Sequence, residues 1–199
     1  MSVTVIAGLG NPGREYAGTR HNLGFTVVEA LAAAEGLKWK KESRFESETA
    51  RWDVRPGLTR LLVKPQTYMN ESGRALRAVL DFHHVAPDAL IVAYDDLNID
   101  LGRVKVSVTG SAGGHNGIAS LLEHLGNGFV RYRLGIGNAR PAEMDLKDFV
   151  LGKFSPAETT FLSNQLTTLV DGLRLLLASG PAHAMNLLNR RDQHEPDQT

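Results

Sequence analysis

The feature that most limits the possible folds is the regular alternation of strand-like and helix-like segments. Residues 3–9 form a nearly continuous apolar run that is rich in β-branched side chains and ends in glycine. This pattern is typical of a buried, parallel strand. Residues 23–35 then repeat apolar side chains at helical spacing, and the two kinds of segment keep alternating to the end of the chain. Such interleaving predicts an α/β fold in which a twisted central sheet is flanked by helices.

A hairpin predicts that this sheet is mixed. Two strand-like runs, 45–54 and 58–63, flank an Arg-Pro-Gly turn and should pair antiparallel. Further strands are expected at 89–94, 104–108 and 131–136, and further helices at 72–83, 116–125 and 155–178. A last short helix is expected after Gly180-Pro181, through Leu188. No linker or repeat interrupts the pattern. We therefore predict one domain over residues 1–199, with 192–199 as a frayed polar tail.

Composition excludes several classes of protein. The 199 residues include no cysteine, so a disulfide scaffold, a thiolate nucleophile and an iron–sulfur cluster are excluded. Lys+Arg and Asp+Glu each number 22, which excludes a uniformly basic nucleic-acid binder but not a local basic patch. No apolar run approaches the roughly 20 residues of a membrane helix, and the first ten residues do not resemble a signal peptide. We expect a cytoplasmic protein without membrane contact.

The first glycine-rich loop formally matches a dinucleotide-binding pattern, G-x-G-x-x-G, over residues 8–13. That pattern requires a helix to begin at once and an acidic residue roughly 20 positions later. Pro12 and Gly13 prolong a turn instead, and the next positions are loop and helix. We interpret the loop as one that holds Asn11 at the rim of a pocket, at the carboxyl ends of the strands.

His21 is the histidine best suited to chemistry, because it follows that loop rather than lying on an apolar helical face. No two of the seven histidines have the close spacing of a metal motif, so no metal is expected. His83, by contrast, continues an apolar stripe, and this position favours a structural role. Asp95, at the end of a predicted strand, could fix the tautomer of His21 or could equally cap a turn. Asp96 is the alternative partner.

Three polar loop positions have a structural and a functional interpretation. Asn70 directly precedes the predicted helix at 72 and could be its cap. His115 and Asn116 lie in a glycine-rich loop that enters a helix, where backbone N–H groups can bind an anion or where both residues can serve as turn and cap.

No G-x-S-x-G elbow and no P-loop is present. The remaining groups favour hydrolysis by an activated water.

Seven short blocks of this sequence resemble the bacterial peptidyl-tRNA hydrolase family in their order and spacing. Together they extend across roughly residues 3–190, and their combination is far more specific than any one block. The blocks are 8–16 (GLGNPGREY), 19–22 (TRHN), 64–73 (KPQTYMNESG), 95–97 (DDL), 113–117 (GGHNG), 133–137 (RLGIG) and 149–154 (FVLGKF).

The resemblance implies a monomeric enzyme without cofactor or metal that hydrolyses the ester between a peptide and the 3′ ribose of tRNA. Its partner would be the acceptor stem and 3′ end of peptidyl-tRNA, and its role the recycling of tRNA. By the family pattern, His21 is the general base, and Asp95 and Asn11 complete the catalytic set. The implied substrate-binding residues are Tyr16, Tyr68, Met69, Asn70, His115 and Asn116. The implied contacts to tRNA phosphates are Lys105, Arg133 and, on the same strand as Lys105, Arg103.

Two rival functions stay open at this point. An RNA-binding factor of the same fold would hold its ligand without cleaving it, but such a factor has no use for a poised base. A hydrolase of small esters or peptides would share the cleft chemistry, but it would not need Lys105 and Arg133.

Overall fold

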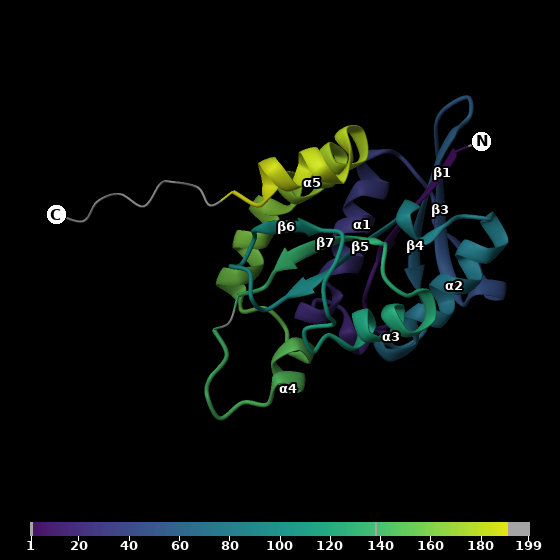
Figure 1. Ribbon diagram of the computed structural model, residues 1–199. Coiled ribbons are helices and arrows are strands. Elements are labelled where there is room, and N and C mark those ends of the chain that lie inside the picture. Colours follow the sequence, from purple (N-terminus) through teal and green to yellow (C-terminus); the bar gives the residue numbers. More distant parts are fainter. Residues whose placement is uncertain (1, 138, 191–199) are drawn as a thin grey trace.

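A seven-stranded mixed sheet organises the protein, which we describe from a computed structural model over residues 2–137 and 139–190 (Figure 1). The strand order is β2-β3-β4-β1-β5-β7-β6. Strands β4, β1, β5 and β7 are mutually parallel, whereas β2, β3 and β6 pair antiparallel with their neighbours. The strands are β1 Ser2–Gly8, β2 Lys40–Glu42, β3 Ser47–Arg55, β4 Leu58–Pro65, β5 Leu90–Asp96, β6 Val104–Ser107 and β7 Val130–Gly135. The predicted α/β class and mixed sheet are confirmed.

Helices cover both faces of the sheet. The α-helices are α1 Leu23–Ala34, α2 Ser72–His83, α3 Asn116–Leu125, α4 Leu146–Leu151 and α5 Pro156–Leu188. Short 3-10 turns are η1 Arg14–Tyr16, η2 Arg20–Asn22, η3 Ser43–Phe45, η4 Met69–Glu71 and η5 Pro87–Ala89. No helix within the described ranges has both the length and the apolar content to cross a lipid bilayer.

Strand periodicity divides the core into two parts. On β1, Ile6 packs with α1 and α5, whereas its neighbours Val5 and Ala7 pack with α2 and α3 on the opposite face. Successive side chains of a strand point to opposite faces, so a strand with helices on both sides must be apolar throughout. This is why residues 3–9 form an uninterrupted apolar run. The carboxyl ends of the four parallel strands therefore lie along the same end of the sheet, and helices cover both of its faces.

The last part of the chain protects one edge of the sheet. Strand β6 is the outermost strand, and the Asn189 side chain pairs with it as another strand would. Asn189 Oδ1 accepts from the Val106 backbone N–H at 2.7 Å, and Nδ2 donates to the Val106 carbonyl at 2.9 Å. Arg103 also donates to the Arg190 carbonyl at 2.8 Å. The exposed backbone groups of an edge strand are thus partly satisfied within the chain.

Most predicted elements are present with small shifts of their ends, but two were not anticipated. Strand β2 and helix α4 are three and six residues long and carry too little periodicity to be recognised. The two C-terminal helices that we expected are confirmed: they meet at a kink at Gly180, whose φ of 77° is not helical, and both carry the single label α5. The predicted frayed tail at 192–199 lies outside the described residues.

Candidate active site

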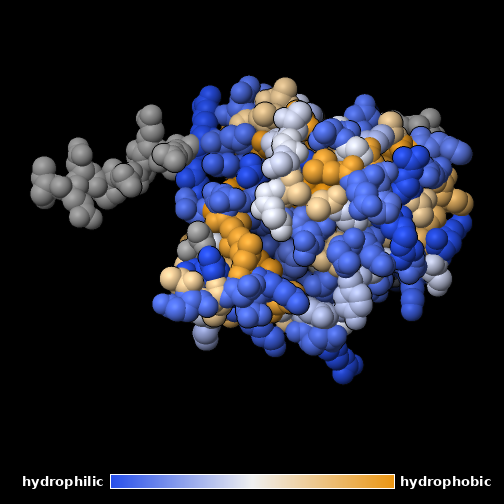
Figure 2. Space-filling model, turned by 60° about the horizontal axis from the view of Figure 1, so that its bottom comes forward, coloured by the Kyte–Doolittle hydropathy of each residue, from blue (hydrophilic) through white to orange (hydrophobic). Residues whose placement is uncertain are grey.

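The carboxyl ends of the parallel strands and the start of α3 surround a cleft of about 980 Å³. Figure 2 turns the end of the molecule that carries α3 and α4 toward the viewer and shows apolar patches among hydrophilic side chains. The predicted catalytic residues and the predicted substrate-binding residues all line this cleft. They are Asn11, Tyr16, His21, Tyr68, Met69, Asn70, Asp95, His115 and Asn116.

His21 is held in η2 by a network around Arg20. The Arg20 backbone N–H donates to the Gly152 carbonyl at 3.0 Å. Its guanidinium donates to Glu158 Oε2 at 2.9 Å and lies 4.3 Å from the centre of the Phe149 ring. These contacts join η2 to α4, to the first turn of α5 and to the segment between them. His21 itself is buried, so its ring has a fixed position at the cleft wall.

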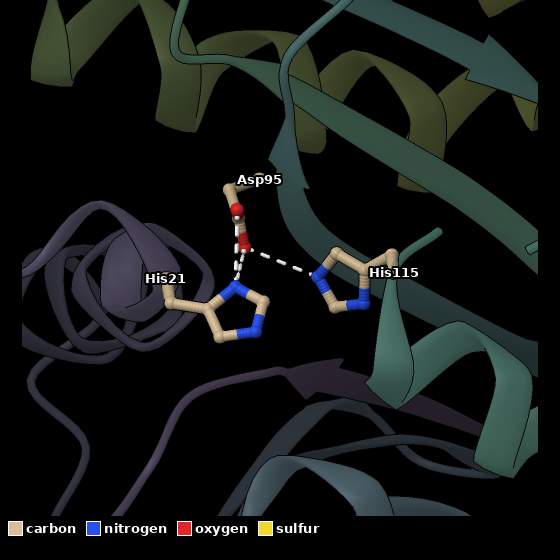
Figure 3. A group of neighbouring side chains, drawn as sticks. All are labelled: His21, Asp95 and His115. Carbon is tan, nitrogen blue, oxygen red and sulfur yellow. Dashed lines mark hydrogen bonds and ion pairs between the residues drawn. The ribbon is translucent and has the colours of Figure 1, made fainter. Parts of the chain in front are cut away.

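Asp95 lies on β5 and faces His21 (Figure 3). His21 Nδ1 is 2.9 Å from Asp95 Oδ1 and 3.1 Å from Oδ2. Burial by itself would raise the pKa of the Asp95 carboxyl, but the two neighbouring imidazoles, His21 and His115, outweigh burial and hold this pKa far below its ordinary value. A carboxylate that accepts the Nδ1 proton leaves His21 Nε2 as the basic nitrogen.

The neighbouring Asp96 has a different role, which resolves one open alternative. Its Oδ2 accepts from Arg133 Nε at 2.8 Å, and its Oδ1 accepts from the Asn98 backbone N–H at 2.8 Å. Adjacent residues of a strand point to opposite faces, so only one of the two aspartates can reach His21. Asp95 is the partner of His21, and Asp96 pairs with Arg133.

His115 is both a helix cap and a site residue. As the N-cap of α3, its Nδ1 accepts the backbone N–H groups of Gly117 and Ile118 at 3.1 and 3.2 Å. Its Nε2 lies 3.1 Å from Asp95 Oδ1, and its ring centre lies 4.7 Å from that of His21. Figure 3 shows both rings directed at the same carboxylate. The cap interpretation of this residue is confirmed, and the same ring also lines the cleft.

Asn11 is fixed by three hydrogen bonds. Its backbone N–H donates to Asn22 Oδ1 at 2.8 Å, and Asn22 Nδ2 donates to the Asn11 carbonyl at 2.9 Å. The Met69 backbone N–H donates to Asn11 Oδ1 at 2.8 Å. Because its side-chain oxygen is occupied, Asn11 offers the cleft amide N–H groups. The loop at 8–13 is no dinucleotide site, since α1 begins only at Leu23.

The other predicted substrate-binding residues form the rim of the cleft, except Met69, which lines the cleft but is buried. Tyr16 and Tyr68 meet edge to face at 6.4 Å, and Tyr68 is 59% exposed. Asn70 and Asn116 are exposed as well. The prediction that Asn70 could cap the following helix is wrong, because Glu71 occupies that position and no side chain there forms a capping bond. The Asn70 amide therefore stays available at the rim.

Two of the predicted phosphate contacts lie side by side. Lys105 on β6 and Arg133 on β7 are direct cross-strand partners, so their side chains share one face of the sheet. Arg133 reaches the cleft lining, whereas Lys105 and Arg103 are not part of it. Arg103 is engaged with the Arg190 carbonyl and lies 3.8 Å from Asp100. The Asp96–Arg133 hydrogen bond uses Nε, so the two terminal nitrogens of this guanidinium are not engaged in it.

Sequence reasoning missed Arg131 and the wall formed by α4. Arg131 is buried and donates through its two terminal nitrogens to the carbonyls of Gly110 and Ser111. It thereby holds the loop that leads to His115. Arg131 lies two positions before Arg133 on the same strand, so the two side chains share one face of the sheet. This spacing could have identified Arg131 from the sequence. Leu146 and Val150 of α4 also line the cleft.

The cluster of His21, Asp95 and His115 has the spacing of a set of metal ligands. Its three candidate ligand atoms lie within 4.8 Å of one another. Each of these atoms is already engaged in a hydrogen bond to another member of the cluster. The arrangement is that of a carboxylate bridging two imidazoles.

A family model, related sequences and a solved structure all indicate the same family. Residues 5–196 match the family model described as Peptidyl-tRNA hydrolase. The chain is 44% identical over 197 residues to the peptidyl-tRNA hydrolase of Gloeobacter violaceus, covering 98% of both chains. It is 43% identical over 196 residues to that of Trichlorobacter lovleyi, covering 98% of this chain and all of the relative. The crystal structure of peptidyl-tRNA hydrolase from Acinetobacter baumannii superposes with a TM-score of 0.85 at 36% identity, over 94% of each chain.

Proposed function

Because the chain belongs to the peptidyl-tRNA hydrolase family, we propose that it hydrolyses the ester between the 3′ ribose of tRNA and a peptide or N-blocked aminoacyl group, using water activated by His21. The reaction recycles tRNA from prematurely released peptidyl-tRNA. The observation that carries the proposal is the buried His21–Asp95 pair in the wall of the cleft. A carboxylate-oriented imidazole beside amide donors can suffice for ester hydrolysis by water.

The proposed step uses only groups that line the cleft. His21 Nε2 takes a proton from a water molecule, whose oxygen attacks the ester carbonyl carbon. The negative charge that develops on the carbonyl oxygen is stabilised by amide N–H donors, for which Asn11 and the rim asparagines Asn70 and Asn116 are candidates. The C–O bond to the ribose then breaks, and the imidazolium returns its proton to the departing 3′ oxygen. Asp95 holds the ring in one tautomer and stabilises its charged form.

The proposed tRNA contact is the pair of Lys105 and Arg133. Two cations on one face of adjacent strands can bind neighbouring phosphate oxygens. The two terminal nitrogens of the Arg133 guanidinium are available for such a contact, because its hydrogen bond to Asp96 uses Nε. Because the net charge of the protein is zero, attraction to RNA depends on this local pair rather than on the whole surface. A hydrolase of small esters would gain nothing from it.

The experiment that tests the function is release of N-blocked aminoacyl groups from tRNA by wild type and His21→Ala. We expect wild type to act on the blocked substrate only, and the variant to lose about 10²–10⁴-fold in kcat with little change in KM. The matched control is His83→Ala, which replaces a half-buried histidine that packs against Phe82 outside the cleft.

Three results would count against the proposal. Equal turnover by wild type and His21→Ala removes His21 from the mechanism. Binding of tRNA without release of the acyl group favours an RNA-binding factor. Equal hydrolysis of a short peptidyl-nucleotide ester and of intact peptidyl-tRNA favours a small-ester hydrolase.

A further inference from the structure

The protonation of the His115 ring is fixed by its place at the start of α3. Nδ1 of this ring accepts two backbone N–H groups, from Gly117 and Ile118. A ring nitrogen that accepts hydrogen bonds carries no proton, so the single proton of the neutral ring lies on Nε2. A proton on Nδ1 would face two N–H donors at 3.1 and 3.2 Å. The helix N-terminus therefore selects one tautomer.

That tautomer determines what His115 can do toward Asp95. Nε2–H lies 3.1 Å from Asp95 Oδ1 and donates to it. The same oxygen accepts from His21 Nδ1 at 2.9 Å. A nitrogen that carries a proton has no lone pair for a cation, so His115 Nε2 cannot serve as a metal ligand in this state. The cluster is thus a chain of donors and acceptors that runs from the α3 backbone through His115 and Asp95 to His21.

Packing leaves the His115 ring little freedom to leave this position. Only 9% of its side chain is exposed, and the Tyr94 ring meets it edge to face at 5.0 Å. A Cβ added at Gly117 would lie 3.0 Å from its Cε1 atom. The ring is therefore a fixed support, whereas Asn70 and Asn116 at the rim are exposed.

We propose that His115 is a positioning residue, whose helix-selected Nε2–H fixes the Asp95 carboxylate and thereby orients His21. This inference rests on the proposed role of His21 as general base. It replaces the substrate contact that the resemblance implies for His115 with a role carried out through Asp95. Because His115 ends the loop that Arg131 holds at Gly110 and Ser111, correct folding of that loop also supports the base.

A spectroscopic measurement tests the tautomer without any substrate. In protein labelled with ¹⁵N-histidine, long-range ¹H–¹⁵N correlation spectra distinguish a protonated ring nitrogen from an unprotonated one, and signals absent from His115→Asn identify this ring. We expect an unprotonated Nδ1 and a protonated Nε2 at neutral pH. A protonated Nδ1 in wild type overturns the proposal.

Two substitutions separate the cap from the positioning role. Asparagine is among the best N-cap residues, and its Oδ1 takes the place of Nδ1, but it has no atom that replaces Nε2. We expect His115→Asn to unfold at a higher temperature than His115→Ala. Both variants should lose about 10- to 100-fold in kcat, as typical when the partner that orients a functional group is removed, while KM stays nearly unchanged.

The control and the contrary outcomes are specific. His124→Asn changes another histidine of α3, whose Nδ1 contacts the Ser120 carbonyl and not Asp95, and it should keep the wild-type kcat. If His115→Asn also keeps the wild-type kcat, His115 is only a cap. If KM rises while kcat is unchanged, it is a substrate contact. Failure of the proposed function is recognised separately, because it would appear as unimpaired turnover by His21→Ala.

Discussion

The charge of Asp95 is the residue-scale property on which the site depends. Its side chain is 2% exposed and accepts from two imidazoles, which is why the pKa of its carboxyl lies below the ordinary value despite burial. A lowered pKa in the folded state contributes stability that is fully present above the unfolded value of 3.8 and is lost as pH falls further. Asp95 is therefore ionised at every pH near neutrality.

Asp95→Asn should impair turnover far more than binding. The amide lacks the charge that stabilises the His21 imidazolium. Its NH₂ group is a donor, so it cannot accept the N–H of either ring as a carboxylate oxygen does. By analogy with other carboxylate–histidine pairs, we expect a fall in kcat of about 10²–10⁴-fold, with KM nearly unchanged. Steady-state kinetics on N-blocked aminoacyl-tRNA measure both constants, and Asp88→Asn, at an exposed position, is the control. Wild-type kcat in Asp95→Asn would contradict an orienting role.

Single residues also mark where prediction from sequence stopped. The sequence placed Asp95 and Asp96 together at a strand end, but which of them faces His21 depends on how β5 pairs with its neighbours. Asn70 and His115 both precede helices, and only the three-dimensional contacts distinguish the uncapped helix from the capped one. A local pattern defines which residue types are present, whereas orientation requires the whole sheet.

At the scale of elements, helices α2 and α3 approach each other closely at Gly73. An ideal Cβ at this position would lie 2.1 Å from the Ser120 carbonyl oxygen, and the Gly73 backbone N–H donates to Ser120 Oγ at 3.0 Å. This contact matters for the site, because α3 begins beside His115 and α2 follows Asn70. Glycine is required here for space rather than for an unusual φ.

Gly73→Ala should therefore destabilise the fold, although alanine is the better helix former. The clash with backbone costs about 1–3 kcal/mol, and the gain in helix propensity, about 0.5–1 kcal/mol, does not offset it. The free energy of unfolding from urea titration measures the difference. Arg77→Ala, at an exposed position of the same helix, should change it by less than about 0.5 kcal/mol. Stability equal to wild type in Gly73→Ala would contradict the close approach.

Elements with strong periodicity were predictable and short ones were not. The predicted bounds of α2 and α3 match the structure because both helices place apolar residues on one buried side, such as Leu76 and Leu121. Helix α4 has only six residues, so its apolar face was indistinguishable from a loop. The predicted break near Gly180 is present as a bend inside α5, because Pro181 can begin a new helical turn.

At the scale of the whole molecule, a zero formal charge gives a sharp prediction for salt dependence. Without a net field, weaker tRNA binding at higher salt should come from the few cations that displace counterions at phosphates. Lys105→Ala and Arg133→Ala should each raise KM and reduce the slope of log KM against log salt by about 0.7–0.9 per lost phosphate contact. Steady-state assays from low to moderate salt measure this slope.

The control for this prediction is Lys38→Ala, which removes the same charge at an exposed position outside the cleft lining. Its slope should equal that of wild type. If the slopes of Lys105→Ala and Arg133→Ala match it as well, the tRNA backbone contacts another part of the surface.

The pairing of Asn189 with Val106 has a consequence for the newly made chain. Strand β6 is synthesised more than 80 residues before position 189, so until then its outer hydrogen-bonding groups stay open to any other extended polypeptide. A polypeptide that stops short of Asn189 would keep that vulnerability permanently. Such shortened chains should assemble with one another along the open margin even where their cleft is intact.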